Sequence, residues 1–140
     1  MVERCWHAVP SDINLYVAGQ IMWNYNRSVD ECAMEFLQAV YGSENAETMS
    51  KVYQAVRECR EPYCKKRYRG KSQTEWIKSY RKNKYGERAV KALRLLYSVK
   101  IPTWRVPALQ TPNTPQGYML DLERELKDII AFGQLLEPEN

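Results

Sequence analysis

Four cysteines and a single histidine are the side chains of this sequence with the most capacity for metal or nucleophilic chemistry. Cys5, His7, Cys59 and Cys64 could supply four zinc ligands, but they lack the spacing typical of zinc sites. Cys59 and Cys64 can form a disulfide only if a helix ends between them. No spacing supports a Ser-His-Asp or Cys-His arrangement, and no glycine-rich phosphate loop occurs. The sequence therefore predicts no catalytic residue, no metal site and no cofactor.

Positive charge is concentrated in the middle of the chain. Residues 57–91 contain thirteen Lys or Arg and four Asp or Glu, whereas the rest of the chain contains eight and thirteen. This asymmetry indicates an anionic partner, although a run of charge is also typical of a solvated face or a seat for an acidic neighbour. Basic residues mixed with tyrosines suit phosphate contacts and base stacking, but no nucleic-acid reader motif is present. The candidate anion-binding patch comprises Lys65, Lys66, Arg67, Arg69 and Lys71.

The elements that would position these groups are helices. The length of 140 residues fits a single domain over residues 1–140. Apolar residues recur at intervals of three and four, and no useful length alternates with a period of two, so we predict an all-α fold. Four prolines within residues 98–117 predict an irregular segment before a last helix over residues 116–136. No apolar run reaches the ~18 residues of a membrane span, and the first residues do not resemble a signal peptide.

Two parts of the chain repeat with a shift of forty-four residues. In each copy a serine and a glutamate three residues later form a capping box at the start of a helix. In each copy a Tyr-Gly pair is predicted to end that helix, with the tyrosine packing at the corner. The aligned residues are Ser28 with Ser72, Glu31 with Glu75, Tyr41-Gly42 with Tyr85-Gly86, Val52 with Leu96, and Tyr53 with Tyr97.

Each copy reads as a helical hairpin. The first covers about residues 28–61, since Pro62 is expected to stop its second helix, and the second covers about residues 72–99. A hairpin cannot bury its apolar face alone, so stacking of the two is expected to make the core. The predicted fold is a bundle of five to six helices built on two stacked helical hairpins, with the Pro-rich irregular segment before the last helix.

The same residues carry a family resemblance. The stretches "NLYVAGQIMWN" and "SVDECAMEFLQAVYG" resemble the region that follows the catalytic barrel in several bacterial glycoside hydrolases. The stretches "EWIKSYRKNKYG" and "ALRLLYSV" are similar to a pattern in the helical carboxy-terminal domain of alpha-N-acetylglucosaminidases, and alpha-glucuronidases carry comparable domains. The resemblance covers residues 12–99. It departs from the alpha-N-acetylglucosaminidase pattern at Asn83-Lys84, where that pattern has Arg-Arg.

The resemblance implies a non-catalytic helical accessory domain of a carbohydrate-active enzyme. Such a domain packs on, or borders, a catalytic barrel, which needs roughly 250 residues and cannot fit in this chain. The implied partner is the barrel of a parent glycoside hydrolase, and this chain by itself is not expected to be an enzyme. An accessory domain is also expected to leave an apolar patch uncovered when it is isolated.

Trp23 and Asn24 are the candidate carbohydrate contacts. A tryptophan can stack on a sugar ring and an asparagine can hydrogen-bond hydroxyl groups, but Trp23 is expected to be buried at a helix end. The alternative function is that of a small stand-alone helical protein, which binds nucleic acid or an acidic protein partner through the basic region 60–84. Nucleic acid is the less favoured partner, and no membrane partner is expected.

Overall fold

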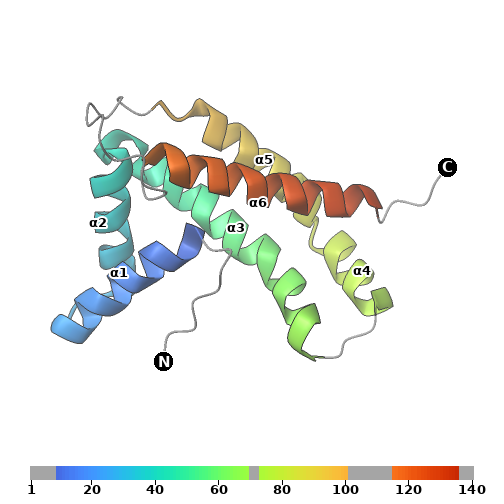
Figure 1. Ribbon diagram of the computed structural model, residues 1–140, viewed down its shortest axis with the longest axis horizontal. Coiled ribbons are helices and arrows are strands. Elements are labelled where there is room, and N and C mark those ends of the chain that lie inside the picture. The colour runs from blue at the N-terminus through green and yellow to red at the C-terminus, as the bar shows by residue number, and fades with distance from the viewer. Residues whose placement is uncertain (1–8, 70–72, 101–114, 136–140) are drawn as a thin grey trace.

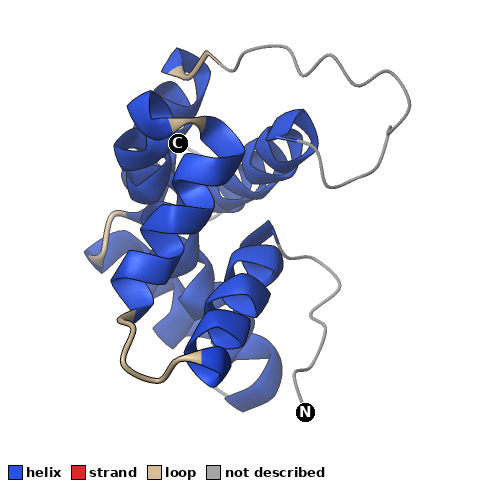
Figure 2. Ribbon diagram, turned by 90° about the vertical axis from the view of Figure 1, so that its left-hand side faces the viewer, coloured by secondary structure: helices blue, strands red, loops and turns tan. Residues whose placement is uncertain are grey.

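The computed structural model describes the backbone of residues 9–69, 73–100 and 115–135, and the side chains of residues 12–59, 77–100 and 115–134. Within these ranges the chain forms six α-helices and no strand, which confirms the predicted all-α bundle (Figure 1; Figure 2). No helix in this part of the chain is long and apolar enough to span a membrane. The helices are α1 (Val9–Trp23), α2 (Val29–Tyr41), α3 (Ser43–Arg69), α4 (Gln73–Lys82), α5 (Tyr85–Ser98) and α6 (Pro115–Leu135).

α2 begins and ends at the residues that the sequence indicates. The Glu31 amide donates to Ser28 Oγ at 3.1 Å, and the Ser28 amide donates to Glu31 Oε2 at 3.1 Å, which is the predicted capping box. At the other end Gly42 has a φ of 87°, and its amide donates to the Gln38 carbonyl at 3.0 Å. Glycine adopts a positive φ without strain, so α2 ends at Tyr41 and α3 starts directly after Gly42.

α3 is longer than the sequence predicts. It continues through Pro62 to Arg69, so the prediction that it ends near Glu61 is wrong. A proline inside a helix removes one backbone hydrogen bond and costs about 3 kcal/mol. That cost is local, whereas the preceding turns are already fixed by packing as far as Cys59, which is buried. Because Cys59 and Cys64 lie on one continuous helix, the condition for a disulfide between them is not met.

The second corner turns at a different residue from the first. α4 ends at Lys82, and Lys84 adopts the left-handed conformation with a φ of 51°. Tyr85 and Gly86 are thus the first two residues of α5, and the prediction that this pair ends a helix is wrong. The glycine is needed here for space and not for its φ, because a Cβ on Gly86 would lie 2.9 Å from the hydroxyl oxygen of Tyr80.

α3 is the central helix of the bundle. It contacts α2, α5 and α6, while α4 contacts α3 and α5. α1 packs on α2 at one end of the molecule, and α4 lies at the opposite end (Figure 1). The two predicted hairpins stack through their second helices, α3 and α5, and α6 packs against both. The capping box predicted at Ser72 and Glu75 lies outside the residues whose side chains are described.

The two copies of the repeat do not contribute equally to the core. The aligned pair Val52 and Leu96 is buried in both copies. Tyr53 is buried, but its counterpart Tyr97 is 58% exposed. Burial at an aligned position is therefore decided by what packs over it. Residues 101–114 of the predicted Pro-rich segment lie outside the described residues, and α6 starts one residue before the predicted start, at Pro115.

Candidate interaction surfaces

The predicted anion-binding patch lies at the end of α3 and beyond it. The backbone of Lys65, Lys66, Arg67 and Arg69 belongs to α3, but their side chains lie outside the described residues. Lys71 lies outside the described residues altogether. The patch stays a prediction, and the cations that the structure does describe lie further along the chain.

Cys59 is the member of the candidate zinc set whose side chain is described, and Cys5, His7 and the side chain of Cys64 lie outside that part of the chain. Cys59 is buried, its Sγ lies 3.7 Å from the carbonyl oxygen of Tyr85, and burial raises its pKa to about 11. A thiol that stays protonated is a poor nucleophile and a poor metal ligand. The described residues contain no group of three or more His, Cys, Asp or Glu that could hold a metal ion.

Three tyrosines and an aspartate form a polar cluster inside the bundle. The hydroxyl groups of Tyr41 and Tyr53 lie 2.8 Å apart, and the Tyr118 hydroxyl donates to Asp12 Oδ2 at 2.6 Å. Burial raises the pKa of Tyr53 to about 12 and also raises the pKa of Tyr41 and Tyr118. These hydroxyl groups stay protonated at neutral pH and link helices by hydrogen bonds. Tyr41, as predicted, is a packing residue at the first corner.

Trp23 is the last residue of α1 and is 92% exposed, so the prediction that it is buried at the helix end is wrong. Among the described side chains of α1, the buried ones are Ile13 and Val17, which lie toward its middle. α1 extends beyond the part that the bundle covers, and its last turn projects into solvent. The burial expected of a large aromatic side chain needs a neighbour, and among the described residues none covers this end of the helix.

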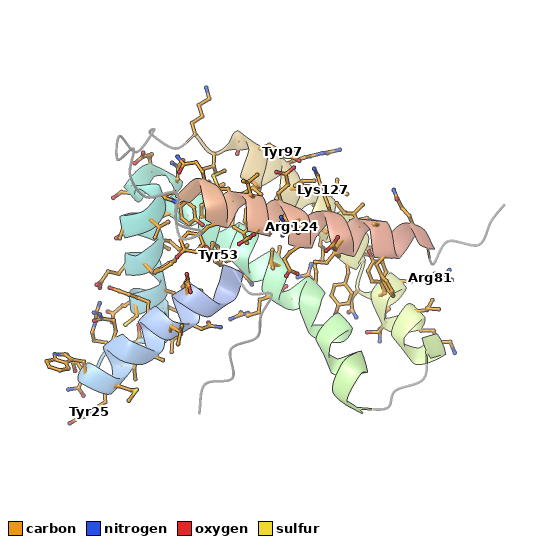
Figure 3. The ribbon with its side chains drawn as sticks, in the orientation of Figure 1. Tyr25, Tyr53, Arg81, Tyr97, Arg124 and Lys127 are labelled. Carbon is orange, nitrogen blue, oxygen red and sulfur yellow. The ribbon has the colours of Figure 1, made fainter. Side chains whose placement is uncertain are left out.

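Trp23 belongs to an exposed apolar cluster where α1 turns into α2. Met22, Trp23 and Tyr25 are 88%, 92% and 85% exposed, and Val29, the first residue of α2, is exposed as well. We call these four residues the aromatic tip. Figure 3 places Tyr25 at the end of the α1–α2 pair, away from the bundle. Large apolar side chains exposed together are characteristic of a partner-binding surface.

The turn inside the aromatic tip is held by hydrogen bonds. The Asn24 amide donates to the Gln20 carbonyl at 2.9 Å, and the Arg27 amide donates to the Asn24 carbonyl at 3.2 Å. Asn24 Oδ1 accepts from the Asn26 amide at 3.1 Å, so Asn24 begins the turn. The backbone that presents the aromatic side chains is therefore fixed before any partner binds, which lowers the ordering cost of binding.

A polar clamp fastens this turn to the two helices beside it. Arg27 donates through Nη1 to Gln20 Oε1 at 2.9 Å and through Nη2 to Glu35 Oε2. The Tyr16 hydroxyl donates to the other oxygen of Glu35. The Arg27 guanidinium, and after it the Tyr16 hydroxyl, hold the pKa of Glu35 below its usual range. Both carboxylate oxygens are engaged in joining α1, the turn and α2, which is a structural role.

The exposed cations of α4 and α5 form a second surface. Residues 77–100 contain eight Lys or Arg and one Glu, whereas residues 12–56 contain two Lys or Arg and six Asp or Glu. Of those eight cations, Arg88 is half-buried and pairs with Glu58 of α3, and the other seven are exposed. We call these seven residues the basic face: Lys78, Arg81, Lys82, Lys84, Lys91, Arg94 and Lys100.

The three last members of the basic face lie beyond the region predicted for anion binding. Lys91 and Arg94 follow the exposed side of α5, opposite the buried Ala89 and Ala92. The signal that identifies them is their three-residue spacing against the apolar stripe of the same helix. Lys100 follows the helix, so periodicity does not identify it.

Comparison with known proteins gives no relative: no protein-family model, no curated protein and no solved structure matches the chain. The resemblance to glycoside hydrolase domains remains an expectation from the sequence. What this chain binds must then be inferred from the chemistry of the aromatic tip and of the basic face.

Proposed function

We propose that this chain is a non-catalytic helical accessory domain of a carbohydrate-active enzyme, and that it docks on its parent through the aromatic tip. The parent would be a glycoside hydrolase whose catalytic barrel lies outside this chain. The single observation that supports the proposal is the joint exposure of Met22, Trp23 and Tyr25. Met22 and Trp23 belong to "NLYVAGQIMWN", one of the stretches that carry the family resemblance.

Large apolar and aromatic side chains supply most of the binding energy of an interface. Burying a large apolar side chain completely contributes about 1.5–3 kcal/mol. Aromatic anchors are often hot spots, whose truncation costs at least about 2 kcal/mol. Because hydrogen bonds already fix the turn that links Trp23 and Tyr25, most of this energy remains available for binding. The tip suits an apolar recess on the surface of a larger partner.

If the tip borders the substrate cleft of the parent, Trp23 is the side chain that would stack on a sugar ring. Asn24 is restricted by the turn, since its Oδ1 accepts from the Asn26 amide. Its side-chain NH₂ group can donate to a sugar hydroxyl, and the second lone pair of Oδ1 can accept from one. Carbohydrate contact by these two residues would therefore combine stacking by Trp23 with hydrogen bonds from Asn24.

The test compares this chain alone with the complete product of its gene. Sequencing the coding region on both sides shows whether a barrel is encoded with it, and hydroxyl-radical footprinting then measures side-chain oxidation in both proteins. Trp23 and Tyr25 are expected to be oxidised rapidly in the isolated chain and to be protected in the complete protein. Leu120 is the matched control, because it is exposed and lies outside the tip. The absence of a barrel, or equal oxidation of Trp23 in both proteins, would overturn the proposal.

A second candidate function is favoured by the basic face, which continues the predicted basic region 60–84 as far as Lys100. In this reading the chain is a stand-alone helical protein that binds nucleic acid or an acidic protein partner. Such binding depends on charge and weakens steeply with salt. Retention on an immobilised nucleic acid at low salt is the expected result, and no retention would eliminate nucleic acid as the partner.

A further inference from the structure

We infer that the basic face binds the phosphate backbone of nucleic acid without sequence preference, and that the ring of Tyr97 stacks on a base beside it. The basic face and the aromatic tip share no residue: the tip lies where α1 turns into α2, whereas the basic face follows α4 and α5 (Figure 1). The inference deepens the second candidate function, on which it rests, and does not depend on the proposed docking. A failure of either can be recognised without the other.

Positive and negative charge are separated along the chain. Residues 77–100 carry eight Lys or Arg against one Glu, whereas residues 12–56 carry two against six. A surface with one sign of charge attracts a polyanion over a distance and orients it during the encounter. The acidic residues within 12–56 repel the same polyanion, so binding is directed to the exposed sides of α4 and α5.

Much of the positive charge of the basic face is not neutralised inside the protein. Among the side chains that the structure describes, no ion pair engages Lys78, Lys82, Lys91 or Arg94. Lys84 lies 4.0 Å from Glu87, which is the outer limit of an ion pair on an exposed helix. Cations without an ion pair are available to replace the counterions condensed on the phosphates, and the release of those counterions is the main driving force of non-specific binding.

Exposed cations and an aromatic ring lie close together along α5. Lys84, Lys91 and Arg94 are all exposed, and they span about 15 Å at the helical rise of 1.5 Å per residue. Tyr97 follows Arg94 by three residues, so the two side chains are neighbours on the helix surface, and the tyrosine is 58% exposed. Cations that follow a backbone, with an aromatic ring beside them, are the usual equipment of proteins that bind single strands.

The ring of Tyr97 is held in place from α6. Its hydroxyl donates to Glu123 Oε1 at 2.8 Å, and Lys127 Nζ lies 2.5 Å from the same oxygen. Figure 3 shows Tyr97 on α5 close to Lys127 on α6. Because Lys127 neutralises Glu123, this contact does not place an uncompensated negative charge next to the bound phosphates. A ring fixed in this way loses little conformational freedom when a base stacks on it.

The composition of the basic face favours nucleic acid over an acidic protein. Five of its seven residues are lysines. Lysine is depleted in protein–protein interfaces, whose centres are apolar and aromatic, whereas it is a common phosphate contact. On α5 the apolar surface next to these cations is confined to Leu95 and Tyr97. The part of the face on α5 therefore lacks the apolar centre that a stable protein interface needs.

The test measures binding of the whole chain to a fluorescent oligothymidine by anisotropy. If three to five phosphates are neutralised, the affinity is expected to fall roughly 20- to 130-fold between 50 and 200 mM salt, from a slope of about 0.7 per phosphate. The double variant Lys91→Glu/Arg94→Glu is expected to bind at least tenfold more weakly at 50 mM salt and to show a smaller slope. Lys51→Glu makes the same charge change per residue on α3, within the acidic residues 12–56. This variant should bind like the wild type.

Variants of Tyr97 separate nucleic acid from other polyanions. Tyr97→Ala is expected to weaken binding at least fivefold, because stacking on one base contributes about 1–3 kcal/mol. Tyr97→Phe keeps the ring and loses only the bond to Glu123, so it should bind several times more tightly than Tyr97→Ala. Circular dichroism confirms that each variant is folded.

Competition with other polyanions completes the test. Polyglutamate and heparin, added at the same concentration of charge, are expected to displace the oligothymidine less effectively than unlabelled oligothymidine does. Equal displacement by either polymer would assign the basic face to an acidic protein or an acidic polysaccharide and would overturn the inference. No binding at 50 mM salt, or binding that is unchanged in the double variant, would overturn it as well.

Discussion

Gly133 of α6 is the position where one added methyl group tests the packing of this bundle most directly. A Cβ there would lie 2.9 Å from the Cε1 and Cζ atoms of the Tyr80 ring, and closer still to its hydroxyl oxygen. The ring has little room to move, since its centroid lies 5.9 Å from that of Tyr85 and 5.7 Å from that of Phe132. The Tyr80 hydroxyl also donates to the Ile129 carbonyl at 2.6 Å.

Two opposing effects determine how Gly133→Ala changes the free energy of unfolding. Inside a helix, alanine is favoured over glycine by about 0.5–1 kcal/mol. Forcing a methyl group into a packed site costs about 1–3 kcal/mol, and a shift of the ring that breaks the Tyr80 hydrogen bond costs about 1 kcal/mol more. The packing cost is larger, so we expect net destabilisation of about 1–3 kcal/mol, or a Tm lower by roughly 3–9 °C.

The assay is urea unfolding followed by circular dichroism, with Gly19→Ala as the matched control. Gly19 also lies inside a helix, α1, but a Cβ added there would meet no neighbouring atom within 4 Å. The control variant should therefore gain about 0.5–1 kcal/mol from helix propensity alone. If Gly133→Ala is stabilised by the same amount as Gly19→Ala, the close packing of Tyr80 against α6 is refuted.

Three further measurements test other parts of the structure. Ser28→Ala removes the capping box of α2 and is expected to lower the free energy of unfolding by about 1 kcal/mol, measured in urea; an unchanged midpoint would contradict the cap. Arg27 lowers the pKa of Glu35, so the stability that Glu35 contributes should be present above its unfolded pKa of about 4.3 and should disappear as the pH falls through the lower folded pKa. Urea unfolding of the wild type and Glu35→Gln between pH 3 and pH 7 checks this, and a constant difference over that range would disprove it. In a chain where Cys59 is the only cysteine, Ellman's reagent at pH 8 should react slowly with the native protein and rapidly after unfolding, because burial raises the thiol pKa to about 11.

The accuracy of the sequence predictions depends on the range of the interactions involved. The all-α fold, the capping box at Ser28 and the corner at Gly42 are confirmed, because each depends on residues within one or two turns of each other. The end of α3 is predicted wrongly at Pro62, since the local preference of proline is outweighed by a helix already packed on its neighbours. The second Tyr-Gly pair shares its letters with the first, but Gly86 makes room for Tyr80 and does not supply the positive φ.

Of the candidate surfaces, the sequence determined the residue types and the tertiary structure decided their exposure. The sequence alone locates an excess of positive charge and a Trp-Asn pair, because charge and identity are properties of the residues themselves. It did not determine that Trp23 is exposed while Tyr53 is buried, nor that the side chain of Tyr97 is exposed beside Arg94. Burial requires a neighbour from elsewhere in the chain. α1 extends past the helices that would cover its last turn, and only the packing of all six described helices fixes where that cover ends.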